Sequence, residues 1–356
     1  MEYMRYCYIS RNYKDITSAG NKAKTDIETT MQRMGFVNIG LAHTVGRGAL
    51  RHFFRNLFGI VKAMCQVRKG DVLVLQYPLK KYYEAMCNVA HWKGAKVITQ
   101  IHDLNSFRSK RLTPEQEMAR LGHSDVVIAH NETMKAWLEA QGCPAKLTTL
   151  GIFDYLSPEP IMSQRKETEG ECKTMFFLGN MNPKSNKFVY DLSNRLKKSM
   201  LYLYGNHYHD ELINKGARAE YEGYAVDMDL MKVNKGDFGL SWYGESLIDG
   251  RGKIGEYMSY NNPHKVSLYL RCHAPVIISK KAGLAAFVEA HGIGITVDSL
   301  TEIDEVIAGV TDEEYRKMKE NVVKVSEKIA EGYYFKCAFE RAVKLLSRDC
   351  RLILRN

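Results

Sequence analysis

Short apolar runs alternate with amphipathic segments through the first part of the chain. The apolar runs predict strands at residues 3–10, 36–41, 71–77, 96–101, 125–129 and 146–150. Apolar positions spaced three and four apart predict helices at residues 21–34, 49–67, 82–92, 114–121 and 132–141. Nearly continuous apolar strands separated by helices are typical of a parallel sheet covered on both faces, so a Rossmann-like domain is expected here.

A polar segment with two prolines, residues 157–173 (SPEPIMSQRKETEGECK), interrupts this pattern and predicts a linker. The alternation then resumes, with strands at residues 175–178, 200–204, 238–242, 276–279 and 293–297. Helices are predicted at residues 188–196, 228–233, 265–271, 284–291, 303–308, 313–329 and 335–346. Thr311 and Glu314 have the spacing of a capping box at the start of one of these helices.

The predicted fold is therefore α/β, with two Rossmann-like doubly wound domains facing a cleft. Residues 1–156 form the first domain, residues 157–173 the linker and residues 174–334 the second domain. Ligands of doubly wound sheets bind beyond the carboxyl ends of the strands. The residues that follow each strand are therefore the candidate functional residues.

Composition narrows the class of protein. The chain has 356 residues, of which 45% are hydrophobic and 26% charged, and this globular composition argues against disorder. No apolar window approaches the ~18 residues of a membrane-spanning helix, and the N-terminus lacks the pattern of a signal peptide. The eight cysteines are scattered, which favours thiols in a reducing cytosol over disulfides or a zinc site.

The net charge of +10 favours an anionic partner, either nucleic acid, an acidic lipid surface or a phosphorylated substrate. No nucleic-acid-binding motif is present, so nucleic acid is not expected, and the absence of GxGxxG argues against an NAD enzyme. In the predicted helix 49–67, Arg51 and Arg55 alternate with Phe54 and Phe58. This pattern suggests a surface helix that touches acidic lipid, and an ordinary helix packed on the sheet is the alternative.

Three loops of the first domain carry candidate chemistry. Ser18 and Gly20 lie in a small turn that opens a helix, where backbone N–H groups suit an anion or an acceptor; a plain turn is the alternative. His102 and Asp103 follow the fourth strand and offer a general base, or else satisfy the backbone of the turn. Asp103 is preferred because a carboxylate is ionised at pH 7. Asn131, after the next strand, is interpreted as a helix cap.

The most informative segment of the second domain is NNPHKVSLYL, residues 261–270. Pro263 suits the first turn of a helix, and Lys265 would lie in that turn. A cation is unfavourable at this end of the helix dipole, so a bound diphosphate is the preferred explanation of Lys265, with a solvated lysine as the alternative. A backbone N–H group near His264 and the hydroxyl of Ser267 would add to the same site.

Other polar residues of the second domain are weaker candidates. Asn180 and Lys184 follow its first strand and are candidates to bind a phosphate or a sugar hydroxyl, with turn chemistry as the alternative. Tyr243 ends a later strand and is expected to close over the same ligand. Asp227 and Asp229 form a DxD triplet, but capping of a helix start explains them, so no metal site is expected.

Five segments occur in order along the chain: AGNKAKTD, IHDLNSFR, DVVIAHNETMKAWLEAQG, FFLGN and NNPHKVSLYLRCHAPVIIS. This ordered set resembles GT-B glycosyltransferases. More narrowly, it resembles bacterial β-1,6-galactofuranosyltransferases of polysaccharide synthesis and the glucosyltransferases that extend O-linked GlcNAc on streptococcal adhesins. The sequence departs from the resemblance at residues 271–274 (RCHA), where small residues are expected near the donor sugar.

The resemblance implies a UDP-sugar donor held mainly by the second domain and a glycan acceptor held mainly by the first. It also implies an inverting single displacement without a metal ion or other cofactor. The C-terminal helix, at about residues 335–356, is expected to cross back onto the first domain.

The predicted function is transfer of a galactofuranosyl or glucosyl group from a UDP-sugar to a glycan in surface polysaccharide or glycoprotein synthesis. Lys265 would stabilise the leaving diphosphate, and Asp103 or His102 would deprotonate the acceptor hydroxyl. The alternative is a non-catalytic nucleotide-sugar-binding partner of a glycosylation complex. The sequence leaves open a lipid-linked acceptor, a peripheral contact of this cytoplasmic protein with the membrane, and a homo-oligomer.

Overall fold

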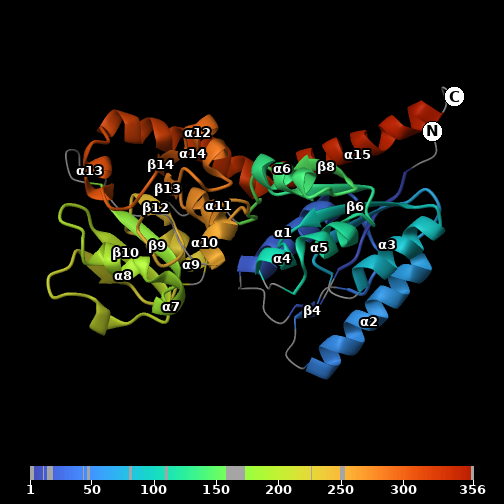
Figure 1. Cartoon of the computed structure of the whole chain (residues 1–356), viewed down its shortest axis with the longest axis horizontal. Helices are drawn as coiled ribbons and strands as arrows, with labels where there is room; N and C mark the ends of the chain where they lie inside the picture. Colours follow the sequence, from blue (N-terminus) through green and yellow to red (C-terminus); the bar gives the residue numbers. More distant parts are fainter. Residues whose placement is uncertain are drawn as a thin grey trace. The chain divides into compact units, whose positions relative to one another are not determined.

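The computed structural model describes residues 4–10, 12–13, 19–42, 44–45, 49–79, 82–108, 111–157, 173–225, 227–248 and 253–353. The chain forms two compact units, one of Met1–Asp154 with Gly332–Asn356 and one of Tyr155–Glu331 (Figure 1). Each unit contains a six-stranded parallel sheet, which confirms the predicted α/β class. Ser18 and all of the predicted linker except its two end residues lie outside the described residues.

The sheet of the first unit has the strand order β3-β1-β5-β6-β7-β8. Its strands are β1 (Tyr6–Tyr8), β3 (Val37–Asn38), β5 (Val72–Tyr77), β6 (Lys96–Ile101), β7 (Val126–Ala129) and β8 (Lys146–Thr149). Its helices are α1 (Ala19–Arg33), α2 (Ala49–Gln66), α3 (Tyr83–Trp92), α4 (Asn105–Arg108), α5 (Pro114–Leu121), α6 (Glu132–Ala140) and α15 (Tyr333–Ile353). A separate parallel pair joins β2 (Asn12–Tyr13) and β4 (Thr44–Val45). Every residue of β5 is buried, because helices cover both faces of the sheet.

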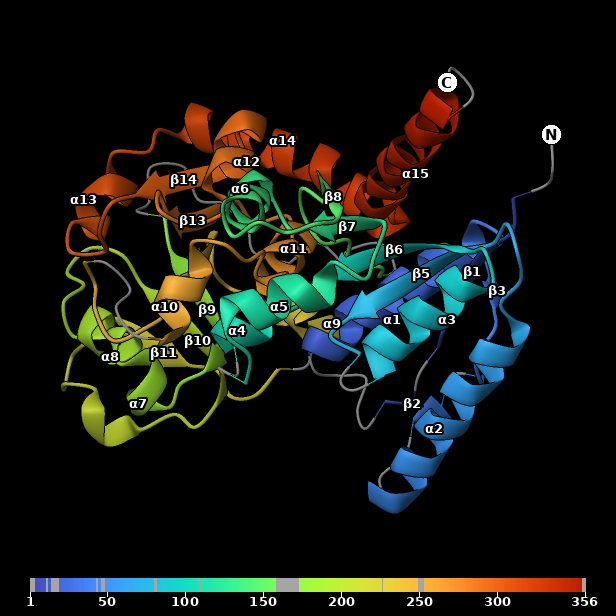
Figure 2. The same cartoon turned by 45° about the vertical axis from the view of Figure 1, so that its right-hand side comes forward.

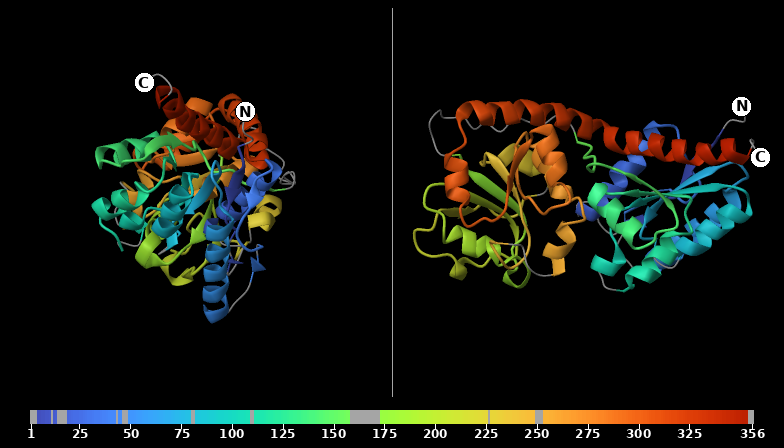
Figure 3. Two further views of the ribbon diagram at one scale, coloured as in Figure 1. Left: turned by 90° about the vertical axis from the view of Figure 1, so that its right-hand side faces the viewer. Right: turned by 45° about the horizontal axis from the view of Figure 1, so that its top comes forward.

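The C-terminal helix α15 belongs to the first unit, as expected from the sequence. It packs against β7 and β8, and its ribbon is red in Figure 3. Lys146 Nζ donates a hydrogen bond to the carbonyl of Leu345 at 3.0 Å. Figures 1 and 2 show α15 and α3 on opposite sides of the sheet. The buried carboxylate of Asp154 accepts hydrogen bonds from the backbone N–H groups of Tyr334 (3.1 Å) and Phe335 (2.7 Å) and so fixes the start of α15.

The sheet of the second unit has the strand order β11-β10-β9-β12-β13-β14. Its strands are β9 (Met175–Asn180), β10 (Leu201–Asn206), β11 (Ala219–Tyr221), β12 (Phe238–Ser241), β13 (Val276–Ser279) and β14 (Gly294–Val297). Its helices are α7 (Pro183–Asn186), α8 (Phe188–Ser193), the 3-10 turn η2 (Asp210–Leu212), α9 (Asp227–Val233), α10 (Lys253–Met258), α11 (His264–Arg271), α12 (Ala285–His291), α13 (Ile303–Ala308) and α14 (Asp312–Glu331). Strand order reverses between β9 and β12, which makes their carboxyl ends the topological switch point of this sheet.

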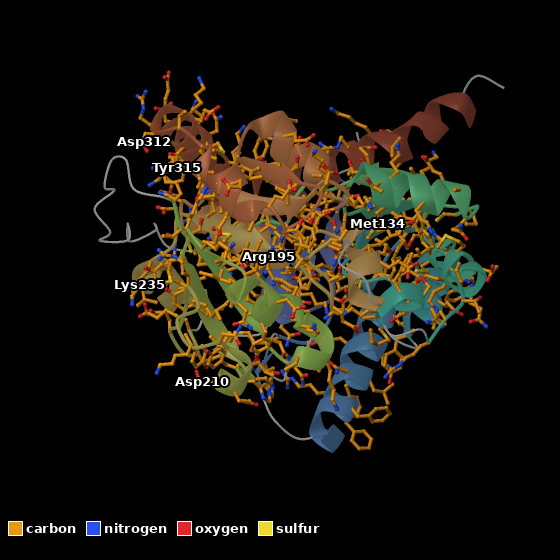
Figure 4. All side chains as sticks on the ribbon, turned by 60° about the vertical axis from the view of Figure 1, so that its left-hand side comes forward. Met134, Arg195, Asp210, Lys235, Asp312 and Tyr315 are labelled. Atoms are coloured by element: carbon orange, nitrogen blue, oxygen red, sulfur yellow. The ribbon has the colours of Figure 1, made fainter. Side chains whose placement is uncertain are left out.

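Helix starts follow the local signals of the sequence. Asn131 Oδ1 accepts from the N–H of Met134 at 2.9 Å and caps α6, as predicted (Figure 4 labels Met134). Thr311 and Glu314 form the predicted capping box, with the N–H of Thr311 donating to Glu314 Oε2 and the N–H of Glu314 donating to Thr311 Oγ1. Pro263 differs from the prediction, because it is the N-cap residue of α11 and the helix begins one residue later. No helix in the described part of the chain is long and apolar enough to span a membrane.

Candidate functional site

In the second unit, the two strands at the switch point pair along only part of their length. Strands β9 and β12 pair only near their amino ends, where Gly239 lies opposite Phe176. Beyond this pair, the hydroxyl of Tyr269 from α11 bridges the strands, accepting from the N–H of Leu178 at 3.0 Å and donating to the carbonyl of Leu240 at 3.3 Å. A Cβ atom on Gly239 would lie 2.4 Å from the Tyr269 ring. The glycine therefore lets α11 pack closely on the strands, and this packing positions the first turn of α11.

Lys265 lies in the first turn of α11, between two aromatic faces. Its Nζ atom is 4.3 Å from the ring centre of Phe177 and 4.1 Å from that of Tyr243. A Cβ atom on Gly179, at the end of β9, would be 3.4 Å from the same Nζ atom. Among the described residues, this ammonium has no carboxylate partner and no hydrogen bond. Cation–π contacts alone hold the charge in place at the switch point.

The electrostatics of Lys265 favour an anion. Burial lowers the pKa of its ammonium to about 7, because a charge removed from water without a counter-ion is unfavourable. Pro263, the N-cap residue, has no side chain that could cap the start of α11. An anion at this position would meet both the ammonium and the positive end of the helix dipole.

The other predicted donor residues are placed around this point with different exposure. Asn180 is the exposed last residue of β9, and Lys184 is exposed in the first turn of α7. The ring of His264 packs on Tyr155 with 5.0 Å between ring centres. Ser267 is fully buried on the inner side of α11. The structure thus brings Lys265 together with Tyr243 and the end of β9, whereas the hydroxyl of Ser267 lies in the packed interior.

Two groups at this end of the sheet were missed by sequence reasoning. Ser241, the last residue of β12, is fully buried, and its Oγ atom has no hydrogen-bond partner among the described residues. Asn261 lies just before α11, and its Oδ1 atom is likewise buried and unpartnered within the described part of the chain. Buried polar atoms are nearly always paired in folded proteins, so each of these two atoms could accept a further polar partner. A serine at the end of a buried strand is the signal that was available in the sequence.

In the first unit, the loop after β6 carries His102 and Asp103. His102 is buried, stacks on Phe153 with 5.5 Å between ring centres, and bonds through Nε2 to Gln76 Oε1 at 2.7 Å. The amide nitrogen of Gln76 donates to the carbonyl of Lys24, so its oxygen must accept from His102. Nε2 of His102 therefore carries a proton and is already engaged. This nitrogen is unavailable as a general base.

Asp103 is more accessible, with 31% of its side chain exposed. Burial raises the pKa of its carboxyl above the ordinary value, while the charges of Arg108 and Lys24 oppose that rise. The nearest approach of Arg108 NH1 to Asp103 Oδ1 is 3.6 Å, which leaves the carboxylate loosely paired. A raised pKa makes a carboxylate a stronger base. Of the two predicted residues, the geometry favours Asp103.

Glu117, on α5, fixes this loop and was not predicted from the sequence. Its fully buried carboxylate accepts from the hydroxyl of Tyr77 at 2.8 Å and from the N–H groups of Asn105 (2.6 Å) and Ser106 (2.9 Å). These bonds hold the two residues that follow Asp103 and Leu104. Thr113 opens α5 with a capping box, a signal that the sequence shows but that was not used.

The remaining candidates are Gly20 in the first unit and the two aspartates of the DxD triplet in the second. Gly20 is exposed at the start of α1, with open space where a Cβ atom would lie. Asp227 and Asp229 lie in the first turn of α9, and their side chains are outside the described set. Among the described side chains, no group of three His, Cys, Asp or Glu residues could hold a metal ion.

Comparison with known proteins agrees with the fold. Residues 6–152 match the family model described as glucosyltransferase 3-like, N-terminal domain, and residues 175–342 match the corresponding C-terminal domain. The β-1,6-galactofuranosyltransferase WbbI of Escherichia coli K12 is 28% identical over 331 residues, covering 91% of this chain and 94% of WbbI. Glucosyltransferase 3 of Streptococcus gordonii is 27% identical over 322 residues, covering 88% of this chain and 91% of that protein.

Among solved structures, the apo form of the lipopolysaccharide outer core galactosyltransferase WaaB is similar in fold. Its TM-score is 0.60 at 13% sequence identity, and the match covers 96% of this chain and 99% of WaaB. Both family domains occur here in order and span most of the chain. The chain therefore belongs to the glucosyltransferase 3-like family and is a glycosyltransferase with the GT-B fold.

Proposed function

We propose that this enzyme transfers a hexosyl group from a UDP-sugar to a hydroxyl of a glycan acceptor, with inversion and without a metal ion. The observation that carries the proposal is the unpaired ammonium of Lys265 at the switch point of the second sheet. The names of the relatives point to a galactofuranosyl or a glucosyl group as the hexosyl group.

In this proposal Lys265 acts on the leaving group. When the bond between the anomeric carbon and the diphosphate oxygen breaks, negative charge develops on that oxygen. The ammonium of Lys265 and the first N–H groups of α11 neutralise it, which lowers the barrier without a metal ion. Asn180, Lys184 and Tyr243 are proposed to contact the rest of the UDP-sugar.

Asp103 is the proposed base. Its carboxylate takes the proton of the acceptor hydroxyl while that oxygen attacks the anomeric carbon from the face opposite the diphosphate. One displacement of this kind inverts the configuration of that carbon. His102 is proposed to support the loop through its bond to Gln76 and its stacking on Phe153, because its Nε2 atom is already occupied.

Titration calorimetry of the full chain with UDP, GDP, CMP and dTDP, with and without EDTA, tests the donor site. We expect UDP to bind equally well with EDTA and the other nucleotides to bind weakly. Lys265→Met keeps the aliphatic stem but removes the charge, and should weaken UDP binding. Lys317→Met, an exposed lysine of α14, is the matched control and should bind as the wild type does. Equal UDP affinity in Lys265→Met would contradict the proposal.

Turnover tests the base separately. Asp103→Asn should reduce kcat by roughly 10²–10⁴-fold, the usual contribution of a general base, and leave UDP affinity unchanged. The anomeric configuration of the product, read by NMR, tests inversion. Retention of configuration, or normal turnover by Asp103→Asn, would reject the single displacement through this carboxylate.

A further inference from the structure

Helix α2 of the first unit is apolar on two opposite faces. Its inner face is buried through Ile60 and Ala63, which pack within the unit. Its outer face exposes Phe54 (51%), Phe58 (64%) and Val61 (48%). At about 100° per residue, these three outer positions lie within about 60° of one another and nearly opposite the inner ones. Large apolar side chains therefore form one continuous outer stripe, which is unusual on a surface in contact with water alone.

The stretch of sequence that contains this stripe carries charges of one sign. No Asp or Glu occurs between Glu28 and Asp71. The same stretch contains the lysine and arginine residues Arg33, Arg47, Arg51, Arg55, Lys62, Arg68 and Lys69. Seven cations with no intervening carboxylate make this stretch of the sequence strongly basic.

Two of these cations flank the stripe directly. By the same helical count, Arg55 and Lys62 lie next to Phe58 along one side of the stripe. Arg55 NH2 donates to the carbonyl of Ala42 at 3.1 Å, and Lys62 Nζ donates to the carbonyl of Gly40 at 2.8 Å. Neither cation is paired with a carboxylate among the described residues. Both therefore add to the positive charge beside the exposed rings.

We propose that the outer stripe of α2 binds the surface of an anionic lipid bilayer, with Phe54, Phe58 and Val61 inserted at the level of the headgroups. Apolar rings beside unpaired cations match an interface that is apolar at depth and negatively charged at its surface. A second copy of the chain fits less well. An isologous contact would place two acid-free segments against each other and so bring like charges together. This proposal does not depend on the donor sugar or on the roles of Lys265 and Asp103.

Vesicle flotation of the full chain tests the proposal. We expect the protein to float with vesicles of phosphatidylcholine containing about 30% phosphatidylglycerol, and to stay unbound with phosphatidylcholine alone. Binding should fall at about 0.5 M salt, where charges are screened within a few ångströms. The double variant Phe54→Ser/Phe58→Ser should partition at least about tenfold more weakly, because the buried apolar area is lost. Tyr224→Ser, which removes another exposed ring (65%), is the matched control and should bind as the wild type does.

Circular dichroism and UDP binding establish that each variant is folded. A folded double variant that floats like the wild type would overturn the proposal, as would equal, salt-insensitive binding to neutral vesicles. Analytical ultracentrifugation without lipid provides the second measurement. A dimer that the double variant loses, combined with no flotation of the wild type, would assign the stripe to a second copy of the chain and reject the membrane.

Discussion

Raising the pH from about 7 to about 9 should weaken UDP binding through a single side chain, Lys265. Burial lowers the pKa of its ammonium to about 7 in the free protein. A bound diphosphate favours the charged form and so raises that pKa in the complex. UDP therefore binds the protonated protein, and an increasingly deprotonated protein must take up a proton to bind it. The charge of the diphosphate itself changes little in this range, because its last ionisation lies near 6.

The magnitude follows from the pKa. With a value of about 7, Lys265 is half protonated at pH 7 and about 1% protonated at pH 9. If only the charged form binds UDP, the affinity falls roughly fiftyfold, or about 2.3 kcal/mol. The same lowered pKa also affects the free energy of unfolding of the protein without UDP. An unbound ammonium that is easier to protonate after unfolding destabilises the free protein by up to about 4 kcal/mol near pH 7, and this penalty shrinks as the pH rises.

Calorimetry in two buffers of different ionisation heat measures affinity and proton uptake together. Uptake should approach one proton per UDP at pH 9, whereas Lys265→Met should show weak, pH-independent binding without uptake. Lys265→Met should also unfold at a higher temperature than the wild type near pH 7, because it removes an unpaired charge. A wild-type affinity that changes less than about threefold between pH 7 and 9, or a variant that keeps the wild-type pH profile, would refute this reasoning.

Three other changes test residues that support the two sites or the start of α15. Glu117→Gln should lower kcat and cost roughly 1–3 kcal/mol in urea unfolding, because an amide cannot accept from both N–H groups of the Asp103 loop. Burial raises the pKa of Asp154 to about 7. This carboxyl should therefore make the free energy of unfolding fall as the pH rises from about 4 to about 7, and Asp154→Asn should flatten that dependence. Gly239→Ala should lower the melting temperature and weaken UDP binding, because its Cβ atom would displace the Tyr269 ring.

The central strands were predictable because they are parallel and buried on both faces. An apolar run such as Lys96–Ile101 is then bounded by polar turns, and the predicted and observed ends of β6 coincide. The elements that the pattern missed are short: β2, β4, β11, α4, α7, α10 and η2 have two to six residues each. Such elements carry too few residues to show a period, and their neighbours in space determine them.

The candidate sites were predictable only in part, for a different reason. Lys265 stood out because a cation in the first turn of a helix contradicts the local rule, and a broken local rule is visible in one sequence. Glu117 and Tyr269 break no local rule. Their roles depend on hydrogen bonds to residues that are distant in the sequence, such as Tyr77 and Leu178, and only the folded structure brings these together.

Arg271 shows how the two kinds of information combine. The resemblance seen in the sequence predicts small residues at residues 271–274, in a segment expected near the donor sugar. In the structure Arg271 is buried, and its guanidinium donates to Ser157 Oγ at 2.8 Å and to the carbonyl (3.1 Å) and Oγ (2.9 Å) of Ser326. It thereby ties the end of α11 to the start of the second unit and to α14.

Lys265 and Arg271 are six residues apart, which is about 9 Å along the axis of α11. One end of this helix therefore carries the proposed diphosphate site and the other end anchors the helix in its unit. A small residue at position 271 could not make these three hydrogen bonds. Packing thus explains an arginine at this position, and Arg271→Met should destabilise the second unit while leaving the preference among nucleotides unchanged. A variant of normal stability with altered nucleotide preference would instead assign Arg271 to the donor site.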